Sequence, residues 1–171
     1  MTGRRTKGGL GLALAATLCA ATPAQAAMGC WNETQTAAAQ VRNLQSRLMV
    51  AAMRCRAMGI DILASYNDFV RSNRETIQAA NGVIMAQFTN GFGPEALLHY
   101  DRFTTSLANA YGADATDQNV CAESAALAEE AAAAAGDPQR LVDIERRMGP
   151  VPTLPGGTCQ LSFASLGPAF E

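Results

Sequence analysis

The residues in this chain that could carry chemistry are a few cysteines, one histidine and several methionines. The cysteines are Cys19, Cys30, Cys55, Cys121 and Cys159, and His99 is the only histidine. Zinc sites use pairs of ligands that lie close together in sequence, and these cysteines are far apart. Widely spaced cysteines are typical of disulfide bonds in an exported protein. We therefore predict no metal site.

His99 is the one residue around which a catalytic triad could be built. Asp101 is too close to it in sequence to orient its ring on a helix, and the chain has no nucleophile elbow. A b-type haem held by His99 and Met49, Met53 or Met85 is the alternative, but no pattern aligns these side chains. We predict no catalytic residue and no cofactor, and we interpret His99 as a surface residue.

The N-terminal residues predict a cleaved signal peptide over residues 1–27. Arg4, Arg5 and Lys7 precede the apolar run "LGLALAATLCA", and a small-residue site around Ala26 follows. The run has about half of the roughly 20 residues that span a bilayer. Cleavage after Ala26 or Ala27 would deliver the protein to the periplasm or outside the cell.

Cys30 lies just after this segment and could be either a lipid-modified first residue or a disulfide partner. Gly29 suits a lipobox, but Ala27 and Met28 do not. Removal of the signal, with Cys19, leaves an even set of four cysteines, whereas acylation of Cys30 would leave three. The sequence favours a disulfide.

Signal cleavage also makes the protein more acidic. Ten arginines, no lysine and fifteen acidic residues remain, for a net charge near −5. An acidic surface without a basic run argues against nucleic acid as a partner. We expect no membrane insertion after cleavage.

The spacing of apolar residues after residue 27 predicts an all-α protein. Residues 28–149 are expected to form one domain, an up-down four-helix bundle with a short fifth helix, and residues 150–171 an irregular tail packed on it. The first helix is predicted over residues 32–56 and the second over 61–90. The third begins at Pro94 and ends at Gly112, the fourth carries residues 120–131, and the fifth runs from Asp137 to about Met148.

Asn73 lies on the apolar stripe of the predicted second helix. The stripe keeps its phase across Asn73, which predicts one continuous helix. We interpret Asn73 as an interhelical hydrogen-bonding residue that fixes register, with a functional role as the alternative.

The disulfide pairing follows by elimination. Cys30 and Cys55 would lie about 37 Å apart on a continuous first helix, too far for a bond. In an up-down bundle, Cys55 and Cys121 lie at the same end. This predicts Cys55–Cys121 and Cys30–Cys159.

One face of the first helix is left unexplained by a simple bundle. Trp31, Met49 and Met53 project opposite the core stripe and form a candidate surface strip. The Cys30–Cys159 bond would bring the tail, with Leu161 and Phe163, to this strip. We predict that the tail covers the strip; the alternative leaves it open as a partner-binding surface.

The stretches "CWNETQTAAAQVRNLQSRLMVAAMRCR" and "GIDILASYNDFVRSNR" resemble a family of small exported helical proteins of alphaproteobacteria. The resemblance covers most of the chain after the signal and implies no particular activity. Some relatives carry the label S-adenosyl-L-homocysteine hydrolase. This sequence does not support the label, because it is too short and lacks the G-x-G-x-x-G motif.

Three functions are compatible with these observations. The favoured one is a non-enzymatic periplasmic binding module that presents a surface to a protein partner. The alternative is a carrier of a small apolar ligand, held between helices or under the tail. An enzyme of unknown reaction comes third, because few titratable groups are suitably placed.

Overall fold

The computed structural model of the chain describes residues 28–149 and 153–159, and this part is all-helical, as predicted. Its elements are α1 (Glu33–Ala57), α2 (Leu63–Ser72), α3 (Arg74–Phe92), the 3-10 helix η1 (Gly93–Glu95), α4 (Ala96–Gly112), α5 (Gln118–Ala132) and α6 (Pro138–Arg147). The described residues form no strand, and an isolated bridge joins Trp31 to Thr158. The predicted signal peptide and most of the predicted tail lie outside the described residues.

Side-chain caps explain where several helices begin. Asn32 accepts a hydrogen bond from the backbone of Gln35, whose side chain accepts one from the backbone of Asn32, so α1 starts with a capping box. Asp117 caps α5, and Asp137 caps α6 ahead of Pro138. The starts predicted at Asn32 and Asp137 are confirmed.

The predicted second helix is wrong in one respect, because Asn73 separates it into α2 and α3. The Asn73 side chain donates from Nδ2 to the carbonyls of Phe69, at 2.9 Å, and Ala131, at 2.8 Å. Its Oδ1 accepts from the backbone of Gly136 at 2.8 Å. A side chain that competes for backbone groups in this way disturbs the helical path locally. The interpretation of Asn73 as an interhelical hydrogen-bonding residue is confirmed.

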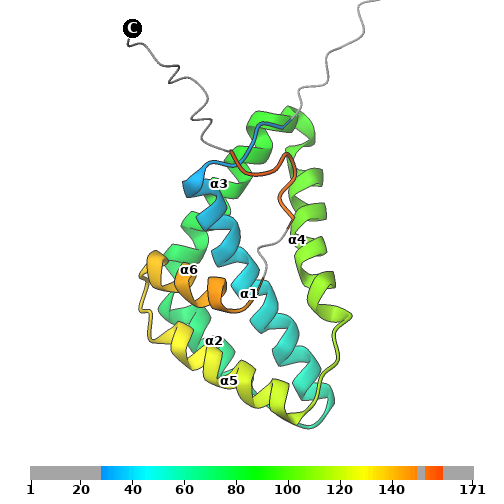
Figure 1. The fold of residues 1–171 in the computed structure, drawn as a ribbon, viewed down its shortest axis with the longest axis vertical. Helices are drawn as coiled ribbons and strands as arrows, with labels where there is room; N and C mark the ends of the chain where they lie inside the picture. The colour runs from blue at the N-terminus through cyan, green and yellow to red at the C-terminus, as the bar shows by residue number, and fades with distance from the viewer. Residues whose placement is uncertain (1–27, 150–152, 160–171) are drawn as a thin grey trace, which may run out of the picture.

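The helices are arranged around α1, which runs through the middle of the molecule (Figure 1). α3 and α4 pack along α1, α5 packs beside α2, and α6 crosses α1. The simple up-down order of four helices is therefore not confirmed. No helix in the described ranges is long and apolar enough to cross a membrane.

The main core lies between α1, α3 and α4, with α6 closing one side. Its largest fully buried side chains are Trp31, Phe69, Phe88, Leu44, Leu48, Ile84 and Leu141. Trp31 lies against Phe88 and Phe103, with ring centroids 5.9 and 5.6 Å apart. A smaller cluster surrounds Cys55 and Cys121.

Candidate functional site

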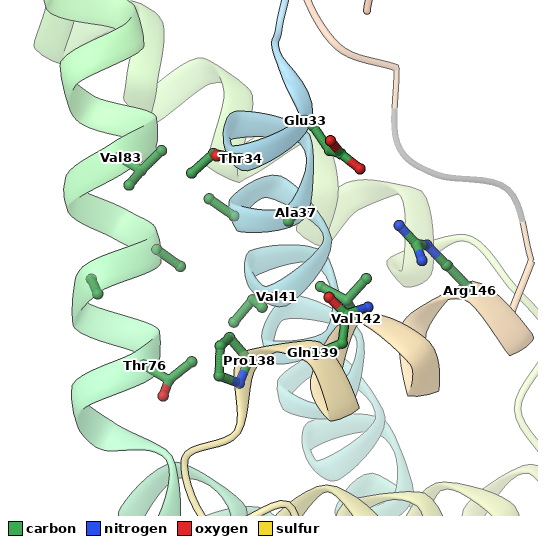
Figure 2. Close-up of a pocket in the computed structure, with 13 residues that line it drawn as sticks. Glu33, Thr34, Ala37, Val41, Thr76, Val83, Pro138, Gln139, Val142 and Arg146 are labelled. Atoms are coloured by element: carbon green, nitrogen blue, oxygen red, sulfur yellow. The ribbon is translucent and has the colours of Figure 1, made fainter.

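A groove of about 450 Å³ lies between α1, α3 and α6 and is the candidate binding site (Figure 2). Its size falls within the roughly 300–1,000 Å³ of small-molecule pockets. Three helices line it: α1 with Glu33, Thr34, Ala37, Ala38 and Val41, α3 with Thr76, Ala79, Ala80 and Val83, and α6 with Pro138, Gln139, Val142 and Arg146.

The walls of the groove are apolar because alanine and valine recur at helical spacing. Ala37 and Val41 lie one turn apart on α1, as do Ala79 and Val83 on α3, so each pair shares a face. Figure 2 shows Val83 and Thr76 pointing from α3 toward α1. Short side chains leave volume between the helices unfilled. An apolar molecule in this volume would be stabilised by about 25 cal/mol for each Å² removed from water.

Polar groups also line the groove, and some of them already have partners. The Thr76 hydroxyl donates to the Gly136 carbonyl at 2.6 Å. Gln139 donates from Nε2 to Asp143 at 3.1 Å. Glu33 and Arg146 lie on the side away from α3 in Figure 2 and bring one charge of each sign to the rim. The site can hold an apolar body with a polar end, and its lining contains no histidine or cysteine for covalent or acid–base chemistry.

A polar cluster is buried on the inner side of α6. Glu145 is 2% exposed, and Asn43 of α1 donates from Nδ2 to its Oε1. Burial raises the pKa of Glu145 to about 7, and the hydrogen bond from Asn43 and the charge of Arg47 oppose part of that rise. Tyr111 of α4 also lies beside Asn43, and burial, followed by the charge of Glu145, raises its pKa. Glu145 therefore places a carboxyl group that changes charge near neutral pH on α6, the helix that forms one wall of the groove.

A second, smaller hollow of about 190 Å³ lies between α1, the end of α4 and α5. Arg47 and Arg54 line it, but both guanidinium groups are already engaged. Arg54 donates to the carbonyls of Tyr111 and Gly112 at 2.6 and 2.8 Å. Arg47 donates to the carbonyl of Met148 at 3.0 Å. Arg54 therefore caps the end of α4 and Arg47 the end of α6, and both are poorly placed to bind an external anion.

The four cysteines after residue 27 come together in the two predicted pairs. The Cα atoms of Cys55 and Cys121 are 5.7 Å apart, and those of Cys30 and Cys159 are 4.9 Å apart. Both separations are typical of disulfide bonds. The first pair is fully buried between α1 and α5, and the second joins the segments that flank the helical domain.

Trp31 is not part of the predicted surface strip, and this prediction is wrong. Trp31 precedes the α1 cap, so extending the helical rotation back to it gave the wrong face. Its indole is 1% exposed and donates to the Pro155 carbonyl at 2.7 Å. Its backbone pairs with Gly157 and Cys159, each at 2.8 Å. The segment before α1 and residues 153–159 therefore hold Trp31 in the core.

The other singled-out side chains do not gather around a site. Met53 is 58% exposed and Met49 is half-buried, both separate from the buried Trp31. His99 is half-buried and stacks on Phe92, with ring centroids 3.6 Å apart. The described residues contain no cluster of histidine, cysteine and acidic side chains that could hold a metal ion. The tail residues predicted to cover the strip, Leu161 and Phe163, lie outside the described part.

Sequence reasoning missed both the groove and Glu145. The groove depends on how α6 crosses α1, and helix periodicity does not report that angle. Glu145 had a detectable signal, because it falls on the apolar face of its helix with Leu141, Val142 and Ile144, all buried. A carboxyl group on such a face is a candidate for an altered pKa.

Comparison with protein-family models gives no match, and neither the comparison with curated proteins nor that with solved structures gives one.

Proposed function

We propose that the protein is a non-enzymatic binding protein of the periplasm or the cell exterior, and that its groove holds a small apolar molecule. The groove itself supports this proposal, because three helices line it mainly with alanine and valine and with few polar side chains. This combination is typical of small-molecule sites. A ligand with a polar end would place that end near Glu33 and Arg146.

The proposed location rests on the cysteines and on the N-terminal residues. Disulfide bonds persist in oxidising compartments, and the two cysteine pairs lie at bonding separations. The basic and apolar pattern of residues 1–27 supports export by a cleaved signal peptide.

A protein partner is the second candidate for the groove. The groove runs along α1 and α3, and its short alanine side chains would allow a partner helix to approach closely. An amphipathic helix bound in this way would use a row of apolar side chains spaced three and four residues apart.

Dye binding tests the proposed function. N-phenyl-1-naphthylamine is a neutral apolar dye whose fluorescence rises in an apolar site. Ala79 lines the groove from an exposed position on α3, so Ala79→Phe should fill the groove without disturbing the core. We expect Ala79→Phe to weaken dye binding at least tenfold.

Ala86→Phe provides the matched control, because Ala86 is also an exposed alanine of α3 but does not line the groove. This variant should bind the dye as the unchanged protein does. Equal affinities for the two variants would contradict the proposed site. Competition by an amphipathic helical peptide but by no small apolar compound would favour the second candidate.

A further inference from the structure

The carboxyl group of Glu145 is buried with too few hydrogen-bond donors for a carboxylate. Its Oε1 accepts from Asn43, while Oε2 has no hydrogen-bond partner among the described residues. A buried carboxylate needs several donors to replace the water that it has lost, whereas a neutral carboxyl group needs fewer. The surroundings of Glu145 therefore disfavour its charged form more than its neutral form.

Two other elements face Glu145 with titratable or charged groups. The positive charge of Arg47 on α1 stabilises the carboxylate form of Glu145. The Arg47 guanidinium is already engaged, because it lies over the Tyr111 ring, 5.3 Å from the centroid, and donates to the Met148 carbonyl. Tyr111 of α4 is neutral at neutral pH, since its pKa is raised. One partly engaged cation and one neutral phenol do not compensate for the loss of water.

The remaining charges near α6 lie at its surface. Glu130 of α5 pairs with Arg147, and these side chains are 45% and 61% exposed. Within α6, Arg146 lies 3.7 Å from Asp143, again at exposed positions. Water screens these groups from the buried carboxyl group.

α6 packs on α1 and buries Leu141, Val142 and Ile144, so any separation of α6 is a local opening that exposes these side chains. It is a short helix, and glycines with positive φ flank it, Gly136 at +89° and Gly149 at +126°. The same helix supplies Val142 and Arg146 to the groove. Movement of α6 would therefore change the shape of the groove.

We propose that α6 is a pH-responsive wall of the groove, packed on α1 while Glu145 is protonated and separating from it more often once Glu145 is ionised. Its effect on a ligand rests on the proposed function, but the motion of α6 does not. Separation of α6 admits water to the carboxylate, which is the form that the closed interface disfavours.

The sign of the effect follows from the two states. The closed structure raises the pKa of Glu145 from its ordinary 4.5 to about 7. The stabilisation of closed α6 is therefore fully present below pH 4.5 and is lost as the pH rises through 7. Between pH 6 and 8.5 the opening equilibrium should increase about tenfold.

Hydrogen exchange of residues 138–147 tests this proposal on the full chain without any ligand. After correction for the intrinsic pH dependence of amide exchange, protection of α6 should fall about tenfold from pH 6 to 8.5, relative to α3. Glu145→Gln keeps an acceptor for Asn43 and removes the titration, so α6 should lose its pH dependence. Glu130→Gln, at the exposed pair, should retain it.

Equal protection of α6 at both pH values would overturn the proposal, and so would the same tenfold change in Glu145→Gln. If Glu145→Gln does not fold, the carboxyl carbon of Glu145 in the unchanged protein decides the matter by NMR. A titration midpoint near 7 supports the proposal, and one near 4.5 overturns it. Because no dye is used, a failure to bind N-phenyl-1-naphthylamine would count against the proposed function alone.

Discussion

Asn73 joins three helices through a single buried side chain. It is 1% exposed, and its amide reaches α2, the last turn of α5 and the turn before α6. The carbonyls of Phe69 and Ala131 also accept backbone hydrogen bonds, whereas Asn73 supplies the acceptor for the Gly136 amide. The position of α6, and with it one groove wall, therefore depends partly on Asn73.

Asn73→Ala should lower the free energy of unfolding by about 2–4 kcal/mol, because it leaves the Ala131 carbonyl and the Gly136 amide without their side-chain partner. Urea denaturation followed by circular dichroism measures this loss. Asn90→Ala is the control, since Asn90 is an exposed residue of α3 and its removal should change stability by less than about 0.5 kcal/mol. Equal effects of the two substitutions would show that the buried hydrogen bonds contribute little.

Residue-level reasoning from the sequence succeeded where the relevant chemistry is local. Asn32 and Asp137 cap the helices that they were predicted to start, and an N-cap acts within three residues. Asn73 was correctly interpreted as a hydrogen-bonding residue, but the break that it makes was missed. The apolar stripe continues on both sides of Asn73, so periodicity alone carries no sign of the interruption.

Two short segments pair with each other at the edge of the helical domain. Residues 28–31 and 153–159 lie side by side, joined by backbone hydrogen bonds and by the Cys30–Cys159 pair (Figure 1). Trp31 and Leu154 pack from these segments into the core. Because this pairing is made by so few residues, the cysteine link should matter for keeping it closed.

A Cys30→Ser, Cys159→Ser double variant should loosen this pairing and let water reach the indole of Trp31. We expect a red shift of tryptophan emission, stronger quenching by acrylamide and a stability loss of about 2–5 kcal/mol. Trp31 is the only tryptophan, so the signal reports this element alone. An unchanged spectrum with unchanged quenching would mean that packing alone holds Trp31.

At the level of elements, the sequence predicted the ends of most helices but not how the helices cross. The predicted first helix, residues 32–56, is α1 within one residue at each end. The wrong face assigned to Trp31 arose at a helix end, where the chain turns and helical rotation no longer applies. The path of α6 across α1 depends on the packing of Leu141 and Val142, which both become fully buried.

For the molecule as a whole, the cysteine pairing was predictable from the sequence and the groove was not. Distance along α1 excludes a Cys30–Cys55 bond whatever the other helices do, and the choice between the two remaining pairings needed only that Cys55 and Cys121 lie at the same end of the domain. No comparable constraint within a single helix defines the groove. It exists because three helices with short side chains meet at an angle that leaves volume between them, and only the assembled fold shows that volume.

The proposed binding of an apolar molecule between α1, α3 and α6 can be measured residue by residue. Titration of 15N-labelled protein with N-phenyl-1-naphthylamine, followed by amide chemical shifts, tests it most directly. We expect saturable shifts concentrated in residues 34–41, 76–83 and 138–142, which line the groove. Saturable shifts concentrated instead around the hollow at Arg54 and Tyr111, or no saturable shifts at all, would contradict it.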